Sequence, residues 1–116
     1  MRSYLGPGDK VELTAPGGGV LVDTGYVIGS YFVVAEGPAA AAAKFIGLRN
    51  GTVRLLKNAT EALTEGQKAF WDDTTKRVRN ASASGRFVIG TVQKVQLAAD
   101  LTADVDLDGV AVTAIP

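Results

Sequence analysis

The sequence of 116 residues contains neither cysteine nor histidine, and each absence excludes a class of chemistry. Without cysteine there are no disulfides, no thiolate nucleophiles and no thiolate metal ligands. Without histidine there is no imidazole ligand for zinc, and no serine–histidine or cysteine–histidine pair for nucleophilic catalysis. An enzyme built on this chain would therefore have to work with carboxylates, lysine, tyrosine or hydroxyl groups alone.

An excess of charge of either sign is also lacking, because 12 basic residues are balanced by 12 acidic ones. Proteins that bind nucleic acid need clustered Lys and Arg to contact phosphates. The one short basic cluster, Lys76, Arg77 and Arg79, follows two Asp, and we expect it to form a solvated strand face. The charge pattern therefore predicts no nucleic acid partner.

Long apolar runs are absent too, so the sequence predicts no segment that crosses a bilayer. The first residues contain no apolar stretch of the kind that a signal peptide carries. We therefore expect synthesis in the cytoplasm and no membrane partner. The apolar fraction of 47% with 21% charged residues is ordinary for one globular domain.

Glycine, in contrast, is abundant, with 14 residues that separate short segments rich in β-branched side chains. This pattern is typical of a small barrel or sandwich of short antiparallel strands. The alternation in Lys10–Thr14 predicts a half-buried strand, and the apolar run Tyr31–Ala35 predicts a strand buried on both faces. Asn50-Gly51 is a type I′ turn signal, which predicts a hairpin between residues 45–48 and 52–56.

One helix signal interrupts the strands, at about residues 58–65. Asn58 can cap the first turn, Glu61 can reach back to it, and Gly66 can adopt the left-handed conformation that ends a helix. The sequence thus predicts an all-β fold with one short helix. We expect a mobile arm at residues 1–8, a β-rich domain at residues 9–112 and a short tail at residues 113–116.

Residues 66–92 are expected to form a meander of three short strands joined by tight turns. Asp72 and Asp73 are adjacent, so on a strand they point to opposite faces and cannot act together as a catalytic dyad. One of them is expected to open the following turn. Phe70 and Trp71 also face opposite sides, which predicts one ring in the core and the other at a candidate subunit contact.

The motif Asp23-Thr24-Gly25 follows an apolar stretch, as it does in aspartic proteases, whose retroviral homodimers have about this chain length. Two such Asp, one from each subunit, would share a proton. The other interpretation is a turn in which Gly25 takes a positive φ. We favour the turn, because a strand follows Gly85-Arg86 where such proteases have a helix.

The motif Asp104-x-Asp106-x-Asp108-Gly109 matches the first half of an EF-hand loop. The bidentate Glu that calcium needs at position twelve would fall on Ile115. The alternating apolar residues favour a strand with one wet face instead. We therefore expect no metal and no cofactor.

The order of short motifs along the chain resembles the small capsid decoration, or cement, proteins of tailed bacteriophages and prophages. The resemblance covers nearly the whole chain, apart from the Ala-rich connector at residues 38–43 and the extension past Gly109. The motifs that carry it are Pro7-Gly8-Asp9, Gly18-Gly19-Val20, residues 26–35, residues 55–66, Phe70-Trp71-Asp72, Lys76-Arg77-Val78, residues 88–92 and residues 104–108.

The resemblance implies a structural virion protein that binds the outer surface of an expanded capsid as a homotrimer and bridges subunits of the major capsid protein, without catalysis. In such proteins an N-terminal arm orders on the capsid, for instance by adding a strand to a coat-protein sheet edge. The candidate arm residues here are Arg2, Tyr4, Leu5 and Pro7. The alternatives are the homodimeric protease that uses Asp23 and a β-domain of another virion part, such as a tail or fibre.

Overall fold

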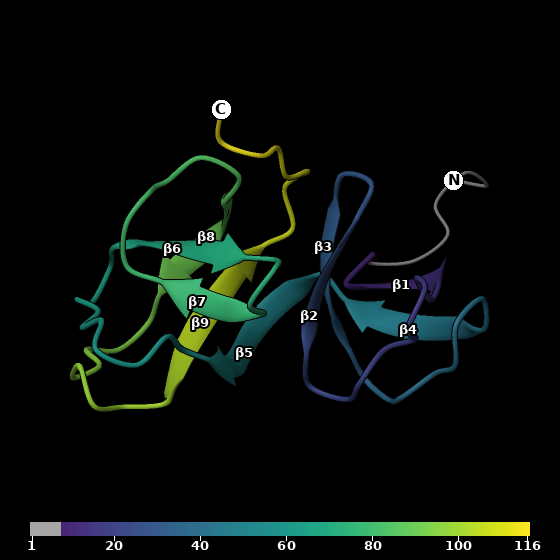
Figure 1. Cartoon of the computed structure of the whole chain (residues 1–116), viewed down its shortest axis with the longest axis horizontal. Coiled ribbons are helices and arrows are strands. Elements are labelled where there is room, and N and C mark those ends of the chain that lie inside the picture. Colours follow the sequence, from purple (N-terminus) through teal and green to yellow (C-terminus); the bar gives the residue numbers. More distant parts are fainter. Residues whose placement is uncertain (1–7) are drawn as a thin grey trace.

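The computed structural model describes residues 8–116, which form nine strands and no helix (Figure 1). None of these residues belongs to a helix long and apolar enough to cross a membrane. The all-β prediction is confirmed. The strands are β1 (Lys10–Thr14), β2 (Gly25–Ile28), β3 (Tyr31–Ala35), β4 (Lys44–Leu48), β5 (Asn50–Leu56), β6 (Lys68–Asp72), β7 (Arg77–Arg79), β8 (Phe87–Val92) and β9 (Thr102–Asp108).

The strands form two antiparallel sheets that lie side by side (Figure 1). The first sheet has the order β1-β4-β3-β2 and the second has the order β5-β9-β8-β6-β7. The second sheet is curled, because a parallel bridge between Lys57 and Val78 brings the end of β5 to β7. The second sheet thus encloses a core of its own.

The larger core fills the second sheet and is centred on Trp71, which is 1% exposed. Phe32 and Val34 of β3 join this core from the first sheet, and the ring of Phe32 meets Trp71 edge-on with centroids 5.2 Å apart. The alternate β3 residues Val33 and Ala35 enter the smaller core of the first sheet. The prediction that this strand is buried on both faces is therefore confirmed, and β3 contributes side chains to both cores.

The predicted helix at about residues 58–65 is wrong. Thr60 has a φ of 72°, and its amide donates to the carbonyl oxygen of Ala98 at 2.8 Å. Leu63 forms an antiparallel bridge with Gln96. The backbone groups that a helix would pair within the segment are thus bonded to a distant loop, and tertiary contacts override the local capping signal.

The predicted hairpin between residues 45–48 and 52–56 is also wrong. Only Arg49 separates β4 from β5, and the two strands belong to different sheets. β5 pairs with β9 along its whole length, from Asn50 opposite Asp108 to Leu56 opposite Thr102. Asn50-Gly51 therefore lies within a strand, and this connection crosses from one sheet to the other.

The three strands predicted in residues 66–92 are present as β6, β7 and β8, but their order is β8-β6-β7 rather than that of a meander. β8 returns on the far side of β6 and pairs with β9. Gly90 of β8 permits this pairing, because a Cβ at this position would collide with the backbone oxygen of Asp106. β6 consequently lies inside the sheet, and Trp71 points from β6 into the larger core.

Candidate functional surface

The candidate arm residues Arg2, Tyr4, Leu5 and Pro7 lie outside the described residues. The structure does describe where the arm joins the domain. The carbonyl oxygen of Asp9 accepts a hydrogen bond from the amide of Arg49 at 2.8 Å, directly before β5. Asp9, which directly precedes β1, therefore lies beside the point where the chain crosses from the first sheet to the second.

β1 and β5 are both edge strands near this junction. The amide of Lys57 donates to the carbonyl oxygen of Leu101, so Lys57 and Leu101 are a hydrogen-bonded pair in the antiparallel register of β5 and β9. Because bonded and non-bonded pairs alternate along an antiparallel ladder, the backbone groups of Thr52 and Arg54 point away from β9. β5 thus offers an open edge, the type of surface on which another strand can pair.

Of the two candidate contact rings, Trp71 lies in the core, and its Nε1 donates to Oδ1 of Asp73 at 3.1 Å. Phe70 is half-buried on the opposite face of β6, where its paired neighbours are Arg79 on β7 and Val88 on β8. The prediction of one core ring is confirmed. The subunit contact at Phe70 stays a prediction.

Asp72 opens the turn after β6, as predicted, because its Oδ1 accepts the amides of Thr74 and Thr75 at 3.0 and 3.3 Å. Burial raises the pKa of Asp72, but these amides and the guanidinium of Arg79 outweigh it, so the pKa is lowered overall. Asp73 instead accepts from Trp71 and from Lys76, whose Nζ is 2.6 Å from its Oδ1. Both carboxylates therefore have structural partners.

Asp23-Thr24-Gly25 forms a turn and the start of β2, as favoured from the sequence, but the residue with positive φ is different. Asp23 is exposed with a φ of 58°, whereas Gly25 has no positive φ. A Cβ on Gly25 would lie 2.6 Å from Phe32 and 2.9 Å from Trp71. The glycine of this motif is therefore needed for the approach of two core rings, and the turn gives the protease interpretation no support.

The strand prediction is confirmed, because Asp104, Asp106 and Asp108 lie on β9. The face of β9 that carries them is only partly exposed to solvent. Asp104 is only 8% exposed and accepts from Nε of Arg54 at 2.7 Å. The side chain of Arg54 accordingly lowers the pKa of Asp104. No group of three or more possible acidic ligands for a metal occurs in residues 8–116.

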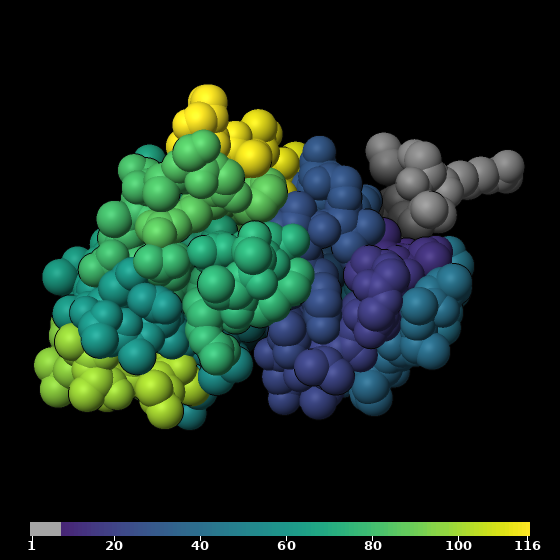
Figure 2. Space-filling model, viewed as in Figure 1, coloured from purple at the N-terminus to yellow at the C-terminus, as the bar shows by residue number. Residues whose placement is uncertain are grey.

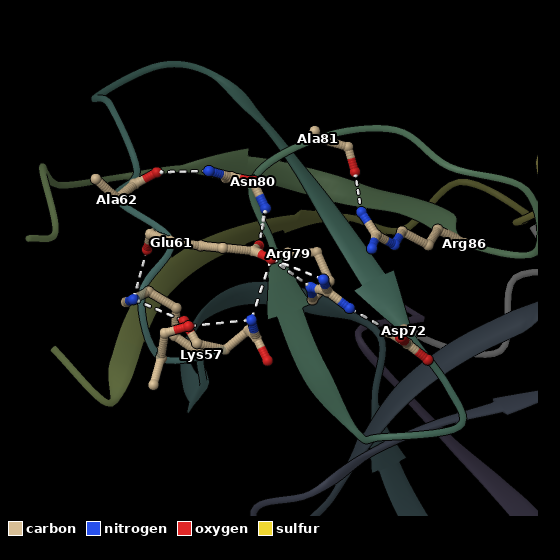
Figure 3. Close-up of polar contacts among 10 residues, drawn as sticks. Lys57, Glu61, Ala62, Asp72, Arg79, Asn80, Ala81 and Arg86 are labelled. Carbon is tan, nitrogen blue, oxygen red and sulfur yellow. Dashed lines mark hydrogen bonds and ion pairs between the residues drawn. The ribbon is translucent and has the colours of Figure 1, made fainter. Parts of the chain in front are cut away.

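A buried lysine organises one end of the second sheet (Figure 3). Lys57 is 2% exposed, and its Nζ donates to the carbonyl oxygens of Asn58, Glu61 and Ala98 at 2.9, 2.5 and 3.3 Å. It has no carboxylate partner among the described residues. Because a buried ammonium is costly unless its donors are satisfied, these three carbonyl groups are held in place around it.

The side chain of Glu61 fastens the same segment to β7 (Figure 3). Its Oε2 lies 2.7 Å from Nη2 of Arg79, and its Oε1 accepts the amide of Asn80 at 2.9 Å. Hydrogen bonding to Arg79 lowers the pKa of Glu61, and the same contact raises the pKa of Arg79. The predicted solvated face is therefore wrong for Arg79, whose side chain is 20% exposed and also contacts Asp72.

The loop between β8 and β9 carries large apolar side chains in solvent. Val95, Leu97 and Leu101 are 61%, 69% and 64% exposed, and we call these three residues the apolar tip. The loop lies at one end of the long axis, opposite the end that holds β1 and β4 (Figures 1 and 2). Its turn is closed by the amide of Leu97, which donates to Oδ2 of Asp100 at 2.8 Å.

An open pocket of about 280 Å³ lies where the two sheets meet. Arg49 lines it, stacks over the ring of Tyr31 at 5.4 Å and donates to the carbonyl oxygen of Gly109 at 2.8 Å. The extension beyond β9 continues across this junction, where the buried Val112 donates its amide to Ser30 at 2.8 Å. These contacts brace the two sheets against each other.

A family model described as phage cement protein matches residues 5–107 of the chain. The chain belongs to the phage cement protein family. The match covers nearly the whole protein and identifies a structural protein associated with the phage capsid. Searches of curated proteins and of solved structures gave no match.

Two features of this cement protein could not be found by reasoning from its sequence. Lys57 follows two leucines at the end of a strand, and nothing in that pattern distinguishes it from an exposed lysine. The aliphatic residues of the apolar tip have the spacing of ordinary core residues. The burial of Lys57 and the exposure of Leu97 both depend on hydrogen bonds between distant segments, which no local pattern specifies.

Proposed function

We propose that this cement protein binds the outer surface of the expanded phage head and stabilises it by bridging neighbouring subunits of the major capsid protein. The observation that carries this proposal is the family match over residues 5–107, which begins within the arm and extends into β9. The expected location is the capsid surface, after synthesis in the host cytoplasm.

The arm supplies one attachment, with Arg2, Tyr4, Leu5 and Pro7 as its contact residues. It leads directly into β1, an edge strand, so an extended arm could continue that strand onto a sheet edge of the coat protein. The family match includes Leu5 and Pro7 of this segment and begins after Arg2 and Tyr4. Main-chain hydrogen bonds would then give affinity, and alternate side chains would give specificity.

The assembly that we propose is a homotrimer, and Phe70 is the candidate subunit contact. Phe70 is half-buried beside Val88, which is 36% exposed, so the two offer a small apolar surface on the outer face of the second sheet. Linked copies raise the effective concentration of each attachment, so modest affinity per copy is sufficient for firm binding. A rigid domain suits such a bridge, and the contacts of Lys57 and Glu61 provide rigidity.

The test is to mix the purified protein with expanded, undecorated heads and to measure bound protein by co-sedimentation. Saturable binding and greater resistance of the heads to heat are expected, and deletion of residues 1–7 should weaken binding. The mass in solution should be three times that of the monomer, and Phe70→Ser should lower it. Heads that take up no protein would refute the proposal, and a monomer both free and head-bound would refute the trimer.

A further inference from the structure

The apolar tip is held away from the core by the backbone of its own loop. Gln96 and Leu63 exchange two hydrogen bonds between their amides and carbonyls, of 3.0 and 2.9 Å, on one side of the loop. The carbonyl oxygen of Ala98 accepts from the amide of Thr60 and from the buried Nζ of Lys57. With these groups fixed, Leu97 cannot fold back onto the sheet without breaking buried polar contacts.

The charges beside the apolar tip have internal partners. Lys94 lies 3.6 Å from Oδ2 of Asp104, and Asp100 accepts the amide of Leu97. Residues 93–101 carry one positive charge, on Lys94, and one negative charge, on Asp100, so a partner surface needs no net opposite charge to match this loop. What the loop presents is a small aliphatic projection, whose exposure to water is unfavourable until another apolar surface covers it.

We propose that the apolar tip is a capsid-docking surface that inserts into an apolar depression of the coat lattice. This inference rests on the proposed function and assigns a second attachment to it. One loop with three aliphatic side chains is small beside the roughly 800 Å² per partner that a stable pair of proteins buries. It therefore suits a contact that is weak singly and repeated over a lattice better than a contact that holds two copies together in solution.

The position of the apolar tip supports the same partner. The tip belongs to the second sheet, whereas the arm is followed directly by Asp9 and by β1 of the first sheet. A protomer that bridges two coat subunits needs two separated attachments, and β1, which follows the arm, lies at the opposite end of the molecule from the loop that carries the apolar tip (Figure 1).

The test compares two double variants. The tip variant carries both Leu97→Ser and Leu101→Ser, and the control carries both Leu21→Ser and Val110→Ser. The control residues are 67% and 64% exposed and lie outside the apolar tip, so both double variants remove similar exposed apolar surface. Both should unfold within about 2 °C of the wild type, because exposed substitutions change stability little. Head binding should weaken about 100-fold for the tip variant, or about tenfold per leucine, and should be unchanged for the control.

Each result decides a different claim. If the wild type and the tip variant bind heads equally well, the inference is refuted and the proposed function stands. If the control weakens as much as the tip variant, binding follows general apolarity, and the inference is refuted. If the tip variant loses self-association but keeps head affinity per copy, the tip is a contact between copies instead. If the wild type does not bind, the proposed function fails, and this inference fails with it.

Discussion

Replacement of Gly25 by alanine is predicted to destabilise the junction between the two sheets. Gly25 lies on β2 with a Cα–H facing two aromatic rings, and an added Cβ would lie 2.6 Å from Cζ of Phe32 and 2.9 Å from Cζ2 of Trp71. Both distances are far below an ordinary carbon–carbon contact. The two rings pack against each other with centroids 5.2 Å apart and are almost completely buried, so neither can move aside freely.

The size of the effect follows from two opposing terms. Insertion of one methyl group into a filled core costs about 1–3 kcal/mol of the free energy of unfolding. Alanine also restricts the unfolded chain more than glycine does, which returns about 0.4–1 kcal/mol. The net loss should therefore be about 1–2 kcal/mol, which lowers Tm by about 4–8 °C for a domain of this length.

Urea unfolding followed by tryptophan fluorescence can measure this loss, because Trp71 is the chain's single Trp and lies at the contact in question. The matched control is Gly37→Ala. A Cβ at Gly37 meets no heavy atom within 4 Å, and its φ is not positive, so the free energy of unfolding should stay equal or rise slightly. If the two variants prove equally stable, close approach of the rings is not the reason for glycine in this motif.

Three further outcomes are expected. The free energy of unfolding should fall as the pH drops from the ordinary pKa values, 4.5 for Glu61 and 3.8 for Asp104, through the lower pKa values of the folded protein. Over this range the unfolded chain binds more protons than the folded chain does. Unfolding midpoints measured from pH 7 to pH 3 check this. Lys57→Met should lower the free energy of unfolding by about 1–3 kcal/mol and speed amide exchange in residues 58–63, because three carbonyl oxygens lose their donor. Trp71→Ala should cost about 3–5 kcal/mol, measured by circular dichroism during urea unfolding.

Each of these three has a result that would contradict it. A midpoint that stays constant down to pH 3 would mean that the carboxylates contribute nothing to folding through their ion pairs. Unchanged exchange in Lys57→Met would show that the ammonium does not order its segment. A loss below about 1 kcal/mol for Trp71→Ala would remove this ring from the centre of the core.

Local patterns in the sequence determined the strand content of this protein. Alternation in β1 and the apolar run of β3 each reflect the faces that one strand presents, so they could be read without knowing its neighbours. The three strands between residues 66 and 92 and the turn at Asp72 were found in the same way. The opposite orientation of Phe70 and Trp71 also follows from a single strand and predicted one core ring.

Only the tertiary structure decided which strands pair and what covers each side chain. β5 pairs with β9 rather than with β4 through hydrogen bonds between distant segments. Lys57 likewise donates to Ala98, which lies 41 residues further along the chain. The hydrogen bonds of Thr60 to Ala98 and of Leu63 to Gln96 replaced the expected helix at residues 58–65. Leu97 is exposed because the neighbouring backbone groups of Gln96 and Ala98 are hydrogen-bonded to distant segments. The burial of a side chain depends on which distant segments pack against it, and the local order of residues along the chain does not specify those segments.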